Sequence, residues 1–248
     1  MYKMATVISH IYNESFLLPF WLDYHKNIFT HGIIIDYMST DNSLEIVRRL
    51  CPSWTIIQSR NNYFEANEID KEVMDIENTI KGYKMALNTT EWLFITDKLE
   101  NILKENCYAL YPIVLGRGDI HTVNNTLEFI QNFTKVYKEY PDRGGYRVIH
   151  NHDNGCYTTG RHFTTHKIVG SENMFVIWAG LYPNNKQILD RKLAIKTKIP
   201  QSDINKGFSH THLYSESHIQ EDMNIVGTDI NDDVYTVAHN YAMKVLGC

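Results

Sequence analysis

Short apolar runs alternate with segments of helical periodicity through the first hundred residues, and this alternation restricts the fold more than any other feature of the sequence. Strands are expected at Lys3–Ser9, Gly32–Asp36, Trp54–Gln58 and Trp92–Thr96. The run at Gly32–Asp36 is apolar up to its final acid, as expected for a strand covered on both faces. Strands that alternate with helices are joined by right-handed crossovers. The sequence therefore predicts an α/β fold with a central, mostly parallel sheet flanked by helices.

The segments between these runs carry helix signals. Pro19 is tolerated only in the first turn of a helix, so the first helix is expected to begin near Phe16 or Leu17. A long helix is expected from Ile69 to Leu87, because its apolar residues recur four and three residues apart.

The second half of the chain is less regular. A strand is expected at Tyr108–Leu115, two short strands within Tyr146–His166, and helices at Asn125–Lys138, Lys186–Lys198, Pro200–Gly207 and Val234–Val245. No internal repeat or long linker separates these segments, which indicates one domain with a C-terminal appendage.

Composition excludes several functional classes. The 248 residues are 43% hydrophobic and 21% charged, as in ordinary soluble proteins, and the net charge of −5 shows no basic footprint for nucleic acid. No apolar run approaches the roughly 18 residues needed to span a bilayer, and the N-terminus has no apolar signal-peptide core. The four cysteines lack CxxC spacing, which argues against a disulfide framework or a zinc ribbon. A cytoplasmic protein is the expectation.

Polar residues follow the end of each expected strand. They are His10, Tyr12, Asn13 and Glu14 after the first strand, Asp36 at the end of the second, Arg60 after the third and Asp97 after the fourth. In an open parallel sheet, ligands bind outside the carboxyl ends of the strands, where strand order reverses. Such residues are also common in helix caps and turns. For Asp36 and Asp97, each of which ends an apolar run, a functional role is the favoured interpretation.

The segments HIYNESFLLPFWLDYH, IIIDYMSTDNS and RNNYFEANEIDKEVM, followed by GYKMALNTTEWLFITD, resemble family 2-type glycosyltransferases of the GT-A fold. This resemblance covers residues 3–100. The later segments YRVIHNHDNGCYTTGRHFTTH and KTKIPQSDINKGFSH are similar to the C-terminal half of the same branch, which includes domains encoded by large algal viruses. The order and spacing of the segments, rather than any single motif, carry the match.

The resemblance implies a GT-A, Rossmann-like domain over residues 1–214, with a nucleotide-binding half at 1–100 and an acceptor half at 101–214. Residues 215–248 would form a helical appendage. The implied donor is a sugar linked to UDP or GDP, and the implied acceptor is a glycan or a protein-linked sugar. The expected nucleotide-binding residues are His10, Tyr12, Asn13, Glu14, Asp36, Arg60 and Asp97. In relatives an acid at the Asp36 position accepts a hydrogen bond from uracil or guanine, and Arg60 would reach phosphate or stack on the base.

The metal-binding motif of this family is altered here. The pattern T-D-x-D-E reads TDKLE at residues 96–100, so Leu99 stands in place of the second acid. Three interpretations stay open: Glu100 replaces the missing ligand, Lys98 neutralises the diphosphate, or catalysis is lost.

A surviving but altered metal site is the favoured interpretation. Its expected ligands are Asp97, Glu100 and either His212 or His210. A cation bridging two phosphates would assist departure of the diphosphate. The expected ion is Mn²⁺ or Mg²⁺, with Mn²⁺ preferred because it accepts imidazole nitrogen more readily.

The catalytic base is expected in the acceptor half. An inverting transferase needs a carboxylate to deprotonate the acceptor hydroxyl, and Asp203 and Asp153 are the candidates, with Glu172 as a third. Asp203 equally fits an acid in the first turn of a helix after Pro200. The sequence leaves open whether the reaction is inverting or retaining.

The histidine-rich segment admits a different function. His150 and His152 match a zinc-ligand pattern and would suit a metallohydrolase, although a structural role is favoured for both. Arg161 nearby would meet phosphate or acceptor, or else form a surface ion pair. Three functions therefore remain: a glycosyltransferase first, a catalytically weakened relative that binds nucleotide sugar or glycan second, and a metallohydrolase third.

Overall fold

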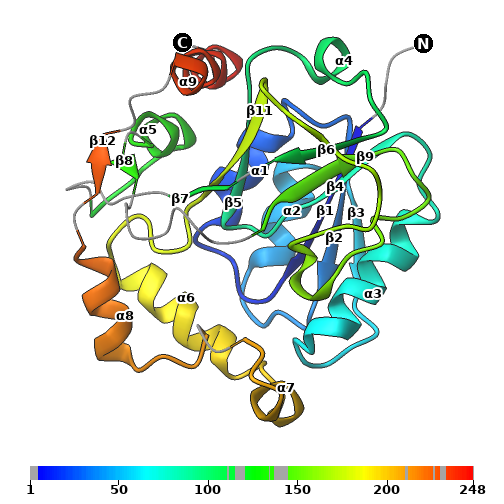
Figure 1. Cartoon of the computed structure of the whole chain (residues 1–248). Helices are drawn as coiled ribbons and strands as arrows, with labels where there is room; N and C mark the ends of the chain where they lie inside the picture. The colour runs from blue at the N-terminus through cyan, green and yellow to red at the C-terminus, as the bar shows by residue number, and fades with distance from the viewer. Residues whose placement is uncertain are drawn as a thin grey trace.

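The computed structural model describes residues 5–110, 112–114, 121–133, 135–136, 145–209, 212–225, 227–229 and 233–247. The elements in chain order are β1 (Ala5–Ile11), α1 (Leu18–His25), β2 (His31–Asp36), α2 (Ser43–Leu50), β3 (Thr55–Gln58), α3 (Ala66–Glu77), β4 (Tyr83–Ala86), β5 (Glu91–Ile95), α4 (Leu99–Ile102), β6 (Cys107–Leu110), β7 (Pro112–Val114), α5 (Thr126–Gln131), β8 (Lys135–Val136), β9 (Arg147–His150), η1 (Thr159–Arg161, a 3₁₀ turn), β10 (Val169–Gly170), β11 (Met174–Trp178), α6 (Lys186–Lys196), α7 (Gln201–Asn205), α8 (Glu216–Met223), β12 (Thr228–Asp229) and α9 (Asp233–Val245) (Figure 1). Within the described residues, no helix is long and apolar enough to cross a lipid bilayer.

A seven-stranded sheet lies at the centre of the molecule, with the strand order β10-β6-β9-β4-β1-β2-β3. Strands β4, β1, β2 and β3 run parallel, and β9 runs antiparallel to both β4 and β6. We call the ends at which these four parallel strands finish the carboxyl edge, and the ends at which they begin the amino edge. Helices flank the sheet (Figure 1), so the predicted α/β fold with a mostly parallel central sheet is confirmed.

Alternation of side chains along β1 and β2 divides the core between two faces of the sheet. Val7 and Ile34 pack in the cluster that contains α1 and α2, whereas Ile8 and Ile33 pack on the other face with α3. Because both faces are covered, these strands are apolar throughout, as parallel strands of α/β proteins usually are.

Most elements lie close to their predicted positions. Helix α1 begins at Leu18 with Pro19 in its first turn, as expected. Strand β3 and helices α6 and α7 fall within the segments that the sequence indicated, and β2 and α9 each begin one residue before the predicted start. The helix expected over Asn125–Lys138 is shorter, because α5 ends at Gln131 and the short strand β8 follows.

The helix expected from Ile69 to Leu87 is wrong beyond Glu77. Helix α3 ends there, and Tyr83–Ala86 further along the chain form β4, which pairs in parallel with β1. Gly82, directly before β4, has a φ of 94°, a left-handed conformation that glycine adopts at no steric cost and that cannot continue a helix. Short apolar runs fit both helical and strand spacing, so the pattern alone did not distinguish them.

The strand expected at Trp92–Thr96 exists as β5, but it does not join the main sheet. It pairs antiparallel with β11 in a separate sheet of order β5-β11-β7. The Trp21 indole donates to the carbonyl of Glu91, and the Tyr24 hydroxyl donates to the carbonyl of Leu93. Strand β5 therefore runs in the same direction as α1, which returns the chain from the carboxyl edge to the amino edge.

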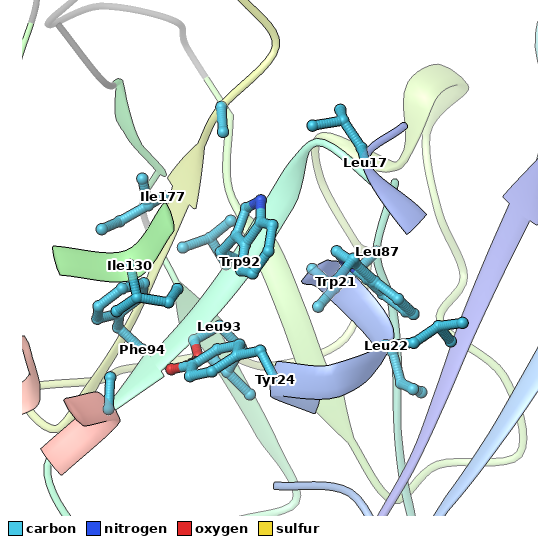
Figure 2. Close-up of a cluster of buried hydrophobic side chains, with 14 of the residues drawn as sticks. Leu17, Trp21, Leu22, Tyr24, Leu87, Trp92, Leu93, Phe94, Ile130 and Ile177 are labelled. Carbon is cyan, nitrogen blue, oxygen red and sulfur yellow. Dashed lines mark hydrogen bonds between the residues drawn. The ribbon is translucent and has the colours of Figure 1, made fainter. Parts of the chain in front are cut away.

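Aromatic packing fixes β5 against α1. Figure 2 shows Tyr24 of α1 beside Trp92 and Phe94 of β5, and Trp21 belongs to the same buried cluster. The ring centroids of Tyr24 and Trp92 lie 5.6 Å apart, and those of Tyr24 and Phe94 lie 5.7 Å apart. Large aromatic side chains in such contact contribute strongly to core stability, so the direction of β5 is well determined.

The loop after β5 lies at the amino edge. The hydroxyl of Tyr83, the first residue of β4, donates to the carbonyl of Glu105 just beyond this loop, at 2.9 Å. Asp97 in the loop accepts hydrogen bonds from the Lys98 backbone N–H at 2.7 Å and the Asn101 side chain at 2.9 Å, and these contacts lower its pKa. The expectation that Asp97 lies at the carboxyl edge is therefore wrong, because its strand runs in the opposite direction.

Leu99, which replaces the second acid of the family motif, packs into the main core and is 6% exposed. We expect Leu99→Asp to lower the free energy of unfolding by about 3–5 kcal/mol, because it buries a charge without a partner. Leu99→Met, of similar volume, should cost less than about 1.5 kcal/mol. Urea denaturation with and without Mn²⁺ measures both. A Leu99→Asp variant of native stability that binds Mn²⁺ more tightly would contradict the placement of Leu99 in the core.

Candidate functional site

The strand order of the main sheet reverses between β1 and β4. The chain passes from β1 to β2 and β3 on one side of β1, and then returns to place β4 on the other side. In open α/β sheets, this switch point at the carboxyl edge is where ligands bind. The loops that follow β1 and β4 therefore flank the position at which a ligand is expected.

His10 lies next to this switch point, near the end of β1. Its ring packs edge-on against Phe64 and Tyr37, with ring centroids 5.6 Å and 6.0 Å away. Burial lowers the pKa of His10 well below its usual value, and the positive charges of Arg161 and Arg147 act in the same direction. The imidazole is therefore neutral at physiological pH and offers one donor and one acceptor to a ligand.

Asn13 and Asp36 shape the loops at the ends of β1 and β2. The side-chain oxygen of Asn13 accepts a hydrogen bond from the Thr40 backbone N–H at 2.8 Å. One carboxylate oxygen of Asp36 accepts from the Ser39 backbone N–H at 3.0 Å, and the residue is 2% exposed. Asp36 thus lies at the carboxyl edge as predicted, while its role toward a nucleotide stays a prediction.

The loop after β2 contains an uncommon backbone conformation. Met38 has a φ of 61°, and its side chain is 44% exposed. A left-handed conformation in a non-glycine residue costs on the order of 1–3 kcal/mol and is frequent at ligand sites. On the loop after β3, Tyr63 is 56% exposed. Two large, exposed side chains therefore stand on neighbouring loops of the carboxyl edge.

Glu14, a predicted nucleotide contact, forms a buried ion pair with Arg191 of α6. The Nε and Nη2 atoms of Arg191 donate to the two carboxylate oxygens of Glu14, each at 2.6 Å. The exposed fractions of the two side chains are 8% for arginine and 4% for glutamate. Bidentate pairs of this kind are strong and directional. Glu14 therefore positions α6 against the first loop of the carboxyl edge.

Two further buried ion pairs surround the end of β4. Arg147 of β9 donates to Glu91 at 2.6 Å, and Arg161 of η1 donates to Asp70 of α3 at 2.8 Å. Asn88 joins the two pairs, because its side-chain oxygen accepts from Arg161 at 3.0 Å and its backbone N–H donates to Glu91 at 2.9 Å. Arg161 is thus part of a buried network, and the surface ion pair considered from the sequence is wrong.

Lys198, two residues after α6, differs from these arginines. Its ammonium lies 4.3 Å from the centre of the Tyr12 ring and 3.3 Å from the carbonyl oxygen of Asn62. Its own carbonyl accepts from the Phe64 backbone N–H at 2.8 Å, which fixes the chain beside the loop after β3. Within the described residues, no carboxylate lies within 4.0 Å of this ammonium.

Arg60 follows β3, but its guanidinium turns toward α3. It pairs with Asp75 at 2.7 Å, and the exposed fractions of the two side chains are 46% and 48%. Its backbone N–H donates to Glu72 at 2.8 Å. The structure therefore places Arg60 at the carboxyl edge, with its charge directed to α3.

The structure does not bring the predicted metal ligands together. Asp97 precedes α4 and Glu100 lies in its first turn, both at the amino edge. His212 instead contributes to the local field at His10 on β1, where burial and the arginines lower the pKa of His10 more strongly. His210 lies outside the described residues. Among the residues that the structure describes, no group of three or more histidines, cysteines or acids is arranged to hold a metal ion. The described residues of the predicted set therefore do not fit Mn²⁺ or Mg²⁺ in the predicted arrangement.

The predicted catalytic bases occupy other positions. Asp203 is completely buried, and one of its oxygens accepts from the Ala66 backbone N–H at 2.7 Å, which caps the start of α3. Asp153 follows the end of β9 at the amino edge, where its carbonyl accepts from Lys84. Glu172 also lies in a loop that contacts the amino edge, because the next residue accepts from the Thr96 backbone N–H.

Three of the histidines form a ring cluster at the amino edge. The rings of His152 and His166 stack with centroids 3.9 Å apart, and each lies 6.2 Å from the ring of His150. His150 is completely buried, and its Nε2 atom faces the Tyr157 hydroxyl at 3.2 Å and a Glu77 oxygen at 3.4 Å. This packing supports the structural interpretation of His150 and His152 over a zinc site.

Sequence reasoning missed several residues that build the carboxyl edge, namely Asn88, Arg147, Arg191 and Lys198. The sequence did contain a sign that Arg147 and its partner Glu91 are buried together. Arg147 interrupts the apolar run YRVIH, and Glu91 begins the run EWLFI. Charged residues inside apolar runs are rarely buried unless they are paired. Lys198 gave no such signal, because a lysine near the end of a helix is usually solvated.

Comparisons with known proteins give distant matches only. No family model matches the chain, and no curated protein matches it. Among solved structures, residues 1–349 of S. aureus TarS match with 12% identity over 87% of this chain and 68% of that chain, with a TM-score of 0.44. The same protein in complex with UDP matches with 11% identity over 89% and 70% of the two chains, with a TM-score of 0.44. Its complex with UDP-GlcNAc matches with 12% identity over 89% and 71%, with a TM-score of 0.42.

Asp203 provides a test that separates a helix cap from a catalytic base. Asp203→Ala should lower the free energy of unfolding by about 1–2 kcal/mol, because α3 loses its cap. Asp203→Asn keeps an acceptor oxygen and should retain most of the stability. Urea denaturation of both variants measures the effect. If both variants keep native stability, Asp203 does not cap α3 and stays a candidate for the base.

The histidine cluster predicts a pH dependence of stability. Burial, followed by the neighbouring His166 and His150, lowers the pKa of His152 below the value of 6.5 in an unfolded chain. The folded state therefore favours the neutral ring, so its contribution is present above pH 6.5 and is lost as the pH falls below that value. His152→Gln should reduce the loss of stability between pH 7 and 5.5, measured by urea denaturation. The exposed His218→Gln serves as the control, and an equal effect of both variants would contradict the assignment.

Proposed function

We propose that this protein is a nucleotide-sugar-dependent glycosyltransferase whose donor nucleotide, UDP or GDP, binds at the carboxyl edge. The observation that supports this proposal most is the set of side chains around the switch point between β1 and β4. His10 and Tyr12 stand at and just beyond the end of β1, Asp36 ends the neighbouring strand β2, and Lys198 lies over the Tyr12 ring. The buried ion pairs of Arg161 and Arg191 lie at the same edge. The resemblance of the segments after β1, β2 and β3 to family 2-type transferases agrees with it.

Each group has a chemical role that suits a nucleotide. The Asp36 carboxylate accepts hydrogen bonds from the N–H of a base or the hydroxyls of a ribose. The aromatic ring of Tyr12 offers a face on which a base stacks. Positive charges at the edge favour an anionic diphosphate over a neutral sugar. The proposed acceptor is a glycan or a protein-linked sugar.

Binding of a nucleotide sugar without transfer is the second candidate function. The observation that favours it is the position of Asp97 and Glu100 at the amino edge, away from the proposed nucleotide. The family uses acids at this motif to hold the cation that assists the leaving diphosphate. The two functions differ only in turnover, so an activity measurement separates them.

A thermal-shift experiment with UDP and GDP, each with EDTA or Mn²⁺, tests the proposal. A nucleotide at 100 times its dissociation constant stabilises the folded state by about 2.7 kcal/mol, so at least one of the two should raise the melting temperature. Asp36→Asn should weaken that binding while the free variant melts like the native protein. Asp190→Asn, on the exposed surface of α6, is the matched control.

Incubation with UDP-GlcNAc and GDP-mannose, followed by detection of free UDP or GDP, then separates the two candidates. Release of the nucleotide supports the transferase, and binding without release supports the binding protein. If neither UDP nor GDP changes the melting temperature under either condition, the proposed function is wrong.

A further inference from the structure

We propose that Lys198 binds the phosphate groups of the nucleotide at the carboxyl edge. This inference rests on the proposed function and deepens it. The sequence pointed to a metal ion that neutralises the charge of the phosphates, and here a protein side chain takes that role. It follows from the distribution of ion pairs among the described residues.

Five of the described cations at the carboxyl edge are each held by a carboxylate. The pairs are Arg191 with Glu14 at 2.6 Å, Arg147 with Glu91 at 2.6 Å, Arg161 with Asp70 at 2.8 Å, Arg60 with Asp75 at 2.7 Å and Lys206 with Glu65 at 3.6 Å. A phosphate that took one of the buried arginines would leave its carboxylate buried without a partner, which is strongly unfavourable. The three buried arginines are therefore poor candidates for a direct phosphate contact.

Lys198 is held by weaker contacts that a phosphate can replace. Its ammonium lies over the ring of Tyr12 at 4.3 Å and near the carbonyl oxygen of Asn62 at 3.3 Å. Neither partner carries a negative charge, so exchanging one of them for a phosphate oxygen gains a charge-assisted hydrogen bond and breaks no ion pair.

The position of Lys198 also suits this role. Its ammonium lies between the loop after β1, which carries Tyr12, and the loop after β3, which carries Asn62. The backbone is fixed, because the Lys198 carbonyl accepts from the Phe64 N–H and its own N–H donates to the carbonyl of Ile195. A fixed backbone with a flexible four-carbon stem lets the charge follow a phosphate while the loop stays in place.

The ligand class follows from this geometry. The ammonium of Lys198 attracts the negatively charged phosphate groups, which a nucleoside lacks. The site should therefore bind a nucleoside diphosphate more tightly than the nucleoside of the same base. Asp36 lies at the end of β2, between β1 and β3. Its charge is opposite to that of Lys198, so it suits the base or the ribose rather than the phosphates. In this proposal Asp36 contacts the nucleoside and Lys198 contacts the phosphates.

Calorimetry on the full chain in EDTA, with UDP and GDP as probes, tests the inference. Lys198→Gln should weaken binding of the preferred diphosphate about 10- to 100-fold, the range expected for a lost hydrogen bond to a charged group. Lys198→Arg should restore most of the affinity. Lys206→Gln removes the same charge from a neighbouring lysine that is already paired, and it should leave the affinity unchanged.

Ligand-observed NMR with the corresponding nucleoside supplies the second readout. Native protein and Lys198→Gln should bind uridine or guanosine equally, because neither carries phosphate. Equal diphosphate affinity of the native protein and Lys198→Gln overturns the inference, and so does a Lys198→Gln variant that loses nucleoside binding to the same extent. If the native protein binds neither diphosphate in EDTA or in Mn²⁺, the proposed function fails and the inference fails with it. Melting temperatures of all variants identify any loss of folding.

Discussion

Three buried pairs of arginine and carboxylate hold the two halves of this protein together at the carboxyl edge of its main sheet. Glu14 binds Arg191, Glu91 binds Arg147 and Asp70 binds Arg161, with every side chain at most 9% exposed. Burying such charges is costly unless both partners are present with good geometry, and removal of one partner typically costs about 3–5 kcal/mol. The acids come from the first hundred residues and the arginines from the second half, so each pair fixes a later segment over the ends of the early strands.

These pairs also determine which charges remain available at the edge. An arginine that already neutralises a buried acid contributes to the local potential, but it does not readily accept a second anion. Lys198 lies in the same region against an aromatic ring and a carbonyl oxygen. Lys198 is a flexible point charge, and no carboxylate of the described residues holds it at the place where we propose that an anionic ligand binds.

The direction of one strand has the largest consequence for function. Strand β5 follows β4 after a short turn and runs back along α1, so Asp97 at its end reaches the amino edge. The family resemblance had implied that the same residue binds the nucleotide, as Asp36 would, and holds a metal ion. With β5 paired to β11 in a second sheet, the motif TDKLE becomes the entry to α4, and its leucine completes the core. An acid at the position of Leu99 would be buried in this core without a partner, so leucine suits the position that it occupies.

The sequence by itself determined the fold class, the first three parallel strands with their helices, and the position of His10, Tyr12 and Asp36 at the carboxyl edge. Apolar periodicity and the position of Pro19 suffice for this, because they reflect local conformation and the burial of each strand. Only the tertiary structure decided the rest. Whether residues 83–86 continue a helix or form a central strand depended on pairing with β1. The direction of β5 depended on aromatic packing against α1, and the partners of the buried arginines lie 56 to 177 residues away in the chain. Local patterns carry no information on contacts over such separations, since those contacts are selected by the packing of the whole core.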